Sequence, residues 1–525
     1  MNNKILLFLA ALIAVTSVVS CKEGPIEPDQ NEQQQSTALK VISIDPVTAP
    51  VGEKVVITGE NFGSNPMGIK VTFGEAAAQL VTLSETSLTA IVPKGEGDVE
   101  VYVSKGDEKA GPLAFTYEYV EVPPVPAKPV VLWIDAEANF YRLRSKSNIK
   151  GFLDKAQENG FNAFVVDVKP VQGDVLYNSS FLPKCTYLAG NQVDRDWDYL
   201  QFFLDEAHKR NMRVTVSTTI MTMGLPQSQT GPGYQEYPDS EYDINYWDDK
   251  FCIEHLPEGL VDIRESRAWD VFAFLNPVLP EVHDYVMRMV TELVTNYDFD
   301  GYILDYCRYM NMNSDFSEAS KKAFEEYAGV TCTDFPNDIY YYAEGVTDKT
   351  QYTPAKYYNQ WVEWRASVIQ GYVKDIRETI KAIKPEVDVE YWAAAWWPLP
   401  HTGQNWTSYT YTNYSYWWKS ANYPSTGFAE YLDIFQLGAY YDTVGDVTNA
   451  ITRAKSITKG VCDVFGTISA ASTLIDLEKA CYTCLKNSDG LMVFELSHII
   501  NNQAWSKIKA GVKKAETELG IEREY

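Results

Sequence analysis

The chain has 525 residues, a net charge of −26, and is 45% hydrophobic and 13% aromatic. This length calls for two or three domains with large cores. Because no basic patch offsets the negative charge, the composition argues against nucleic acid or an anionic membrane surface as a partner. Its many Trp and Tyr residues suit a neutral, polar ligand such as a carbohydrate.

Residues 1–21 have the features of a secretory signal. A single Lys and an apolar run from Ile5 to Val19 precede small residues and Cys21. The run is too short for a transmembrane helix. Its ending, "VVSC", resembles a bacterial lipobox, in which the Cys becomes the lipidated first residue. We therefore expect a lipid anchor at Cys21 and a lipoprotein of the bacterial cell envelope, surface-exposed at the outer membrane. An ordinary signal with an incidental Cys is the alternative.

Residues 22–39 are polar and Gln-rich, which predicts a flexible tether. Residues 40–118 show short alternating runs split by Pro and Gly turns, which predicts a small all-β sandwich. The runs "ITGENFG", "VTFG" and "VPKGEGDVEVYVS" resemble the IPT/TIG immunoglobulin-like family, and this resemblance implies a spacer or an accessory binding module. Residues 119–129 are a Pro-rich linker.

Residues 130–525 alternate apolar strands with amphipathic helices. The pattern predicts the α/β class and a (β/α)8 TIM-type barrel, with an open doubly wound sheet as the alternative. No Gly-rich phosphate turn follows the first strand, which disfavours the open sheet. The expected strands are 130–137, 163–169, 213–220, 301–306, 388–395, 434–441, 463–469 and 490–496, and the main helices are 147–160, 197–211, 280–297 and 357–385.

Three long insertions follow the third, fourth and fifth expected strands. They span residues 221–272, 310–355 and 396–430. Insertions at the C-terminal ends of barrel strands surround the face where barrel enzymes keep their active sites. We expect them to build a cleft.

The stretch "YDFDGYILDYCRY" ends the fourth strand on Asp305, with Arg308 close behind. In a barrel, Asp305 would point into the mouth. Other acidic or basic groups expected there are Asp135, Glu137, Asp167, Lys169, Asp442, Glu495 and His498. Several carboxylates in an aromatic mouth favour glycosidic bond cleavage, in which one acid protonates the leaving oxygen and a second carboxylate attacks or activates water. The alternative is structural, because a strand-end Asp can cap the next helix or pair with Arg.

Four ordered runs resemble the glycosyl hydrolase-like family 10: "GFNAFVVDVKPVQGDVLYNSSFLP", "WDYLQFFLDEAHKRNMRVTV", "LNPVLPEVHDYVMRMVTELVTNYDFDGYILDYCRY" and "WRASVIQGYVKDIRETIKAIKPEVDV". The resemblance implies a barrel and a hydrolase. It makes Asp300 and Gly301 the structural start of the fourth strand and places Lys169 and Asp174 on the motif of the second strand. It also implies that Asp305, Tyr306, Arg308 and Tyr309 are site residues.

Two strand ends depart from the family pattern. Gly438 stands where the family has Gln, and the fifth strand ends in "YWAAAWW". The resemblance therefore does not fix the second carboxylate. Asp442 and Glu495 are our catalytic candidates beside Asp305, with Glu137 and Asp167 behind them.

Residues 392–424 are very rich in Trp and Tyr, interleaved with polar residues. Aromatic faces stack on sugar rings, so we interpret the segment as a glycan-binding loop that includes Trp406. A self-packed lid enclosing Trp417 and Trp418 is the alternative. The expected substrate-binding residues are Arg308, Tyr309, Lys169, Asp167, Glu137, Trp392, Trp396, Trp397 and Tyr440.

The five His residues include no pair with metal-ligand spacing, so we expect neither a metal nor a cofactor. The absence of Gly-x-Ser-x-Gly argues against a serine hydrolase. The sequence predicts a glycoside hydrolase acting on a polysaccharide or on peptidoglycan glycan. The alternatives are a non-catalytic carbohydrate-binding lipoprotein on a barrel scaffold and a transglycosylase.

Overall fold

The computed structural model describes residues 38–118, 128–266, 268 and 271–521. The expected signal peptide with Cys21, nearly all of the tether and most of the linker lie outside these ranges. The chain divides into two compact units, residues 1–119 and 120–525. Within the described ranges, every helix is too short or too polar to cross a membrane.

The first unit is the predicted immunoglobulin-like sandwich of two sheets. Side chains alternate along its strands, as Val55 and Ile57 point into a core that also holds Leu88, Val101 and Phe115. One sheet has the order β1 (Lys40–Asp45), β3 (Lys54–Glu60), β7 (Ser87–Ile91), β6 (Leu80–Leu83), and the other has β2 (Thr48–Ala49), β9 (Glu108–Tyr117), β8 (Asp98–Lys105), β4 (Ile69–Phe73), β5 (Ala76–Ala78).

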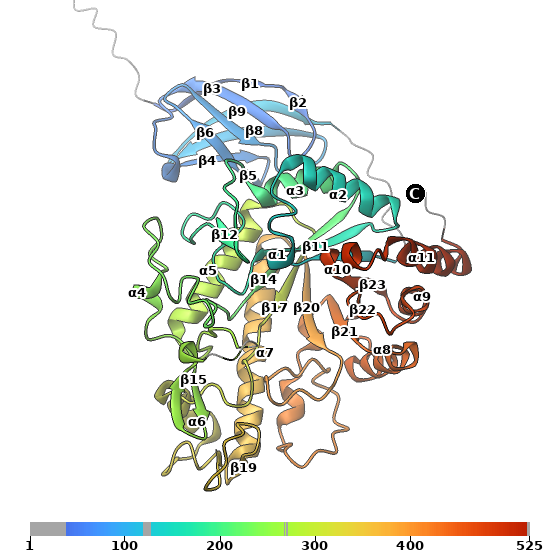
Figure 1. Ribbon diagram of the computed structural model, residues 1–525. Helices are drawn as coiled ribbons and strands as arrows, with labels where there is room; N and C mark the ends of the chain where they lie inside the picture. The colour runs from blue at the N-terminus through green and yellow to red at the C-terminus, as the bar shows by residue number, and fades with distance from the viewer. Residues whose placement is uncertain (1–37, 119–127, 267, 269–270, 522–525) are drawn as a thin grey trace, which may run out of the picture. The chain divides into compact units, whose positions relative to one another are not determined.

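The second unit is the predicted barrel, a ring of parallel strands that closes where β23 pairs with β10 (Figure 1). The strands of the ring are β10 (Val130–Ile134), β11 (Ala163–Lys169), β14 (Arg213–Thr219), β17 (Gly301–Asp305), β20 (Asp388–Ala394), β21 (Ile434–Gly438), β22 (Asp463–Ser469) and β23 (Gly490–Phe494). All of the expected strands are confirmed. β10 ends earlier than predicted because Asp135 caps the short helix α1 (Ala136–Asn139).

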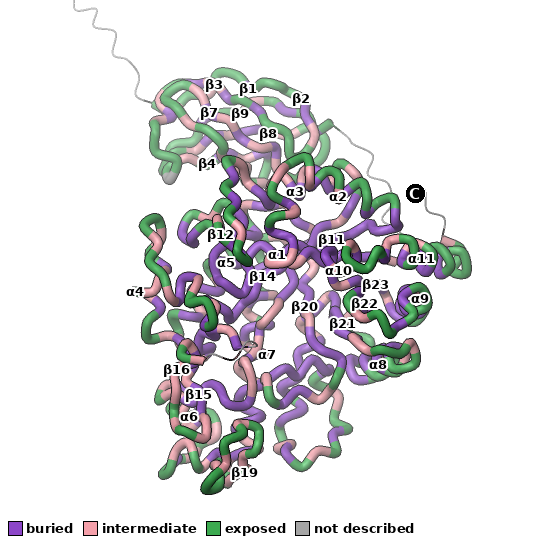
Figure 2. The backbone as a smooth tube through the Cα atoms, in the orientation of Figure 1, coloured by how far each residue is buried: buried purple, intermediate pink, exposed green. Residues whose placement is uncertain are grey.

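Helices surround the ring, and buried stretches alternate with exposed ones along them (Figure 2). Along α5, the residues Val282, Val286, Met289 and Leu293 recur at helical spacing, and all are buried. The outer helices are α2 (Lys146–Glu158), α3 (Tyr199–His208), α5 (Pro280–Asn296), α7 (Tyr358–Ile383), α8 (Val444–Thr458), α9 (Leu477–Asn487) and α11 (Trp505–Leu519), and the short α10 (Leu496–Asn501) follows β23.

The three insertions add small elements at the C-terminal ends of β14, β17 and β20. Part of them packs with the first half of α7 into a second hydrophobic core around Phe316, Phe324, Trp361 and Trp418. Their elements are α4 (Ile244–Trp247), β15 (Ile253–Leu256), β16 (Gly259–Asp262), α6 (Glu318–Ala328), β18 (Tyr340–Tyr341) and β19 (Thr353–Pro354).

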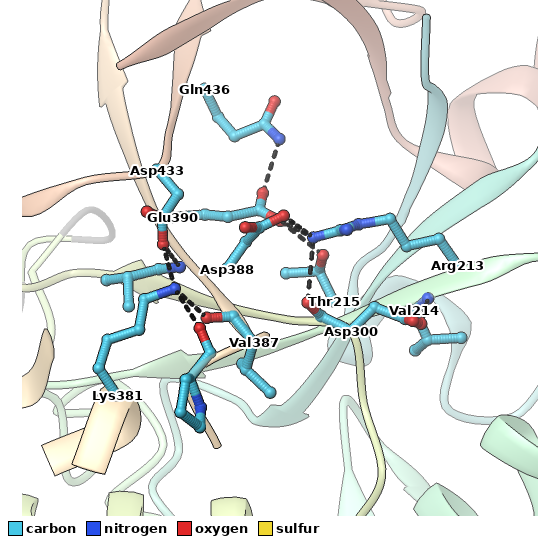
Figure 3. Close-up of polar contacts among 12 residues, drawn as sticks. Arg213, Val214, Thr215, Asp300, Lys381, Val387, Asp388, Glu390, Asp433 and Gln436 are labelled. Atoms are coloured by element: carbon cyan, nitrogen blue, oxygen red, sulfur yellow. Dashed lines mark hydrogen bonds and ion pairs between the residues drawn. The ribbon is translucent and has the colours of Figure 1, made fainter. Parts of the chain in front are cut away.

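Paired charges fill the N-terminal end of the barrel (Figure 3). The Arg213 guanidinium donates to Asp388 Oδ2 at 2.6 Å and lies 3.5 Å from Glu390 Oε1. Glu390 also accepts hydrogen bonds from Thr215 Oγ1 at 2.7 Å and Gln436 Nε2 at 2.8 Å. Each charge in this group therefore has a partner.

The Asp300-Gly301 pair at the start of β17 belongs to this end. Asp300 accepts a hydrogen bond from the Val214 amide at 2.8 Å and bonds His208 Nε2 at 3.0 Å. A Cβ at Gly301 would lie 2.6 Å from both Glu390 Oε1 and Thr215 Oγ1, so the glycine leaves room for the ion pair. The Asp-Gly motif therefore builds the barrel floor.

Candidate active site

Asp305 ends β17 on the inner face of the barrel. Ile303, two residues earlier, belongs to the barrel's interior cluster, and alternation gives Asp305 the same direction. Its Oδ1 accepts a hydrogen bond from the Tyr306 amide at 2.8 Å, and its Oδ2 makes none with the described residues. Tyr306 has a left-handed φ of 47°, so the chain turns away directly after the carboxyl. Burial raises the pKa of Asp305 to about 7, the charge of Asp135 adds to the rise, and the Arg308 guanidinium opposes it.

Asp135 follows β10 in the same way. Val131 and Trp133 point into the barrel, and Asp135 continues their phase. Its Oδ1 accepts a hydrogen bond from the Ala138 amide at 2.8 Å, while Oδ2 has no such partner among the residues described. Burial raises the pKa of Asp135 to about 6, and the Glu495 charge contributes to that rise. Sequence reasoning put Asp135 at the mouth but not among the catalytic candidates, although its inward phase after Trp133 was the available signal.

Asp167 and Glu137 are two further carboxyls whose pKa values respond to the charge of Asp135. Asp167 is 6% exposed, and its Oδ2 accepts hydrogen bonds from Trp133 Nε1 at 3.1 Å and from the Ala136 amide at 3.3 Å. Burial, followed by the charges of Asp135 and Asp305, raises the pKa of Asp167 well above its usual range. Burial, with help from Asp135, raises the pKa of Glu137 to about 8. Burial therefore favours the protonated form of both groups.

Glu495 and Asp442, the expected second carboxylates, have other surroundings. Glu495 is buried and caps α10, accepting hydrogen bonds from the Ser497 and His498 amides, from Ser497 Oγ, and from Asn139 Nδ2 at 2.7 Å. Both of its oxygens are occupied. Asp442 is exposed and accepts a hydrogen bond from Ser472 Oγ at 2.8 Å. Asp135, rather than either of these, is the carboxyl whose charge contributes to the raised pKa of Asp305, and it keeps one oxygen without a hydrogen bond to the described residues.

Three of the expected substrate-binding residues use their side chains for contacts within the protein. Lys169 is fully buried, and its Nζ donates to the carbonyls of Thr219 at 2.6 Å and Thr222 at 2.7 Å. Tyr309 is 1% exposed and lies under the Arg365 guanidinium. Arg308 is partly exposed and donates to the Tyr309 and Met310 carbonyls, both at 2.9 Å. Only Arg308 of these three has a side chain within reach of solvent.

The comparisons with known proteins agree with this layout. Residues 130–422, more than half of the chain, match the family described as Glycosyl hydrolase-like 10. The chain belongs to the glycosyl hydrolase-like 10 family. Residues 39–119 match the IPT/TIG domain. The glycosyl hydrolase-like 10 match includes Asp135 and Asp305 and ends before Asp442 and Glu495.

Curated relatives of this glycosyl hydrolase-like 10 chain are distant. An S-layer-related protein of Niallia circulans is 27% identical over 75% of this chain and 25% of its own length. Glycosyl hydrolase YngK of Bacillus subtilis is 26% identical over 45% of this chain and 37% of its own, and glycosyl hydrolase DigH of Escherichia coli K12 is 28% identical over 47% of each. The chain thus spans less than half the length of each of these relatives. A solved glycoside hydrolase domain, PgaB (BpsB) of Bordetella bronchiseptica, aligns over 73% of this chain and 99% of that one with a TM-score of 0.48 and 12% identity.

The aromatic segment of this family member is mostly internal packing. Trp406 is fully buried and stacks on Phe435, with ring centroids 4.5 Å apart. Trp397 is half-buried among Trp406, Tyr411, Tyr414 and Tyr416. Trp418 is buried as the lid alternative expected, whereas Trp396 and Trp417 are 52% and 68% exposed. Trp392 and Tyr440 lie partly exposed at the inner face of the barrel.

Metal ligands do not cluster in the described part of the chain. No group of three or more His, Cys, Asp or Glu side chains there has an arrangement that could hold a metal ion. The mouth presents the carboxyl groups of Asp135 and Asp305. Their raised pKa values and their position at the C-terminal strand ends suit proton transfer near neutral pH.

Proposed function

We propose that the chain is a glycoside hydrolase that cleaves O-glycosidic bonds in a polysaccharide or in peptidoglycan glycan, with Asp305 and Asp135 as the reacting carboxyls. One observation carries the proposal. Each of these two groups has one oxygen fixed by a backbone amide and the other free of hydrogen bonds to described residues. Fixed carboxyls at a shared mouth are pre-organised for reaction.

The pKa values give the two carboxyls different roles. At a pH between about 6 and 7, Asp305 is largely protonated and Asp135 largely ionised. Asp305 donates its proton to the glycosidic oxygen as the bond to the anomeric carbon breaks. Asp135 serves as the nucleophile or as the base that takes a proton from the attacking water. The anomeric form of the first product distinguishes these two routes.

Two further observations support a glycosidase. The family is glycosidase-like, and two of the relatives reported above are named glycosyl hydrolases. The burial that raises the pKa of Asp167 and of Glu137 favours their uncharged forms, which would add no negative charge against the ionisation of Asp135. For location, we propose a lipoprotein of the bacterial outer membrane, anchored through Cys21. A Cys21→Ala variant should lose incorporated fatty acid and move to the soluble fraction.

The decisive experiment is digestion of a glycan panel with scoring of new reducing ends. Asp305→Asn keeps the shape and the bond from the Tyr306 amide but removes the acid. We expect kcat/KM to fall about 10²- to 10⁴-fold, the usual contribution of a general acid. Asp284→Asn, an exposed position on α5, is the matched control. Full activity of Asp305→Asn would end the assignment, and glycan retention without new reducing ends in the parent protein would favour the binding-only alternative.

A further inference from the structure

The two departures from the family pattern lie side by side in the barrel. β20 and β21 are neighbours, and their register pairs Trp392 with Gln436 and Ala394 with Gly438. A Cβ at Gly438 would lie 2.8 Å from Trp392 Cζ2 and 3.2 Å from the Ala393 carbonyl oxygen. Real side chains do not approach so closely, so the indole needs a glycine at this position. The position of the Trp392 indole therefore depends on the glycine at position 438.

Other aromatic rings on the inner face of the barrel pack next to the Trp392 indole. The Tyr440 ring lies 5.8 Å from that of Trp392, Phe494 lies 5.7 Å from Tyr440, and Trp133 lies 5.8 Å from Phe494. These aromatic rings form an arc along the inner face, from β20 through β21 and β23 to β10. Trp133 at the end of the arc donates to Asp167, beneath the two reacting carboxyls.

The polar atoms of this arc are turned inward. Trp392 Nε1 and the Tyr440 hydroxyl are both shielded from water, and neither makes a well-formed hydrogen bond. Burial raises the pKa of the Tyr440 hydroxyl, and the neighbouring Trp392 opposes that rise. What Trp392 exposes toward the mouth is therefore carbon, not its N–H group. A fixed apolar ring surface beside carboxyl groups is suited to the C–H face of a pyranose ring.

We propose that Trp392, seated on Gly438 and backed by Tyr440, is a specificity-determining platform that stacks against one sugar ring of the substrate. The inference deepens the proposed function, because it takes its ligand class from it. Its contribution is to binding, so it acts on the affinity for glycan rather than on proton transfer. Because the contact uses the ring face and not the N–H group, a phenylalanine in the same place should serve nearly as well.

The test measures binding in a protein that carries Asp305→Asn, so that cleavage does not interfere. The probes are cello-, chito-, xylo- and malto-hexaoses and purified peptidoglycan glycan strands, and the readout is titration calorimetry. Adding Trp392→Ala should weaken the tightest interaction about tenfold or more. Trp392→Phe should restore most of the affinity, and Gly438→Ala should weaken binding because its methyl displaces the indole. Trp417→Ala removes a more exposed tryptophan, stacked on Tyr358 instead, and should leave the affinity unchanged.

Equal affinities of the Trp392→Ala and parental proteins would overturn the inference, as would binding of none of these glycans. Should Trp392→Ala fail to fold, Trp392→Phe and Gly438→Ala decide the matter, because loss of binding in the first or full binding in the second would also contradict it. The proposed function fails separately, if Asp305→Asn still releases reducing ends. Glycan binding that depends on Trp392, without cleavage by the parent protein, would support the platform and contradict only the proposed hydrolase activity.

Discussion

Two carboxyl groups at the N-terminal end of the barrel have the opposite surroundings to Asp305 at its C-terminal end. At the N-terminal end, Asp300 bonds His208, and Asp433 bonds Lys381 and Arg377. Burial works against ionisation of both, yet these partners keep the pKa of Asp300 and of Asp433 below the usual range. At the C-terminal end, burial raises the pKa of Asp305 to about 7 with one cation, Arg308, only partly opposing it.

The difference separates groups that stabilise the fold from groups that are available for chemistry. A paired carboxylate has little left to offer a substrate, and its pKa is far from neutrality. A partly buried carboxyl with an unoccupied oxygen costs stability but can exchange a proton near pH 7. Asp300 and Asp433 on one rim are thus bonded to basic side chains, whereas Asp305 and Asp135 on the other rim each keep one oxygen without a hydrogen bond to the described residues.

Removing the central cation of the N-terminal end should have the largest effect on stability. Arg213→Ala leaves Glu390, which is 2% exposed, without its cation. We expect the free energy of unfolding to fall by about 3–5 kcal/mol, the usual cost of breaking a buried pair. Denaturant titration measures it. Lys374→Ala, which breaks the exposed pair with Glu378, should cost only about 0.3–0.5 kcal/mol. Equal losses in the two variants would refute the contrast.

The pH dependence of activity tests the other rim. With Asp305 protonated below about 7 and Asp135 ionised above about 6, kcat/KM should be bell-shaped with its optimum between those values. It should fall about tenfold per pH unit on either side. The apparent values belong to the pair, so the residual activity of Asp305→Asn should lack the alkaline limb. A flat profile from pH 5 to 9 would contradict these roles.

An Asp→Asn substitution should change the stability with opposite signs at the C-terminal and N-terminal ends of the barrel. Asp305 represents the C-terminal end. The unfolded Asp305 carboxyl ionises near its ordinary pKa of 3.8, whereas the folded one holds its proton to about 7. The parent protein therefore loses stability as pH rises between these values, and Asp305→Asn does not. At pH 7.5, we expect that variant to be more stable by about 4 kcal/mol and, at pH 3.5, about equal to the parent.

Asp300→Asn should behave in the reverse manner. The folded Asp300 has a pKa below its ordinary value, so its ionised form contributes stability that is present above about pH 4 and is lost on acidification. The variant should be less stable than the parent at pH 7.5, and the difference should shrink toward low pH. Thermal unfolding of both variants across one pH series makes the comparison, and the same sign for both would count against it.

The smallest effect is expected at Asp442. Its carboxylate is exposed and bonded to Ser472, so Asp442→Asn should change kcat/KM by no more than about twofold, as for an ordinary surface substitution. Steady-state kinetics on the best glycan of the panel provides the number. A loss comparable to that of Asp305→Asn would instead make Asp442 a catalytic partner.

The fold was largely predictable because the ring strands are short apolar runs bounded by turn residues. "GYILD" and "AFVVDVK" give the bounds of β17 and β11 almost to the residue. The position of Asp305 followed from its strand. Asp135 was harder to single out, because "VVLWIDAE" looks like one continuous strand. The side-chain cap on the Ala138 amide, which ends β10 and starts α1, is a contact that the apolar pattern does not show.

The packing within the aromatic segment could not be predicted, for a different reason. Polar residues interleaved with Trp and Tyr predicted a glycan-binding loop, yet Asn405 and Thr407 are fully buried. Thr407 Oγ1 lies 2.7 Å from the Tyr414 hydroxyl, and Asn405 Nδ2 donates to the Tyr423 carbonyl at 3.2 Å. Polar groups that satisfy one another can enter a core, and such pairing depends on contacts that sequence spacing does not give.

The closure of the ring has a consequence for how the protein matures. β10, which leads into Asp135, pairs on one side with β23, the strand that ends at Phe494. A growing chain therefore cannot complete the wall of the barrel beside Asp135 until almost all of it has been made. A polypeptide that stopped at residue 422, where the family match ends, would lack β21, β22 and β23 and would have an open wall instead of a smaller closed barrel.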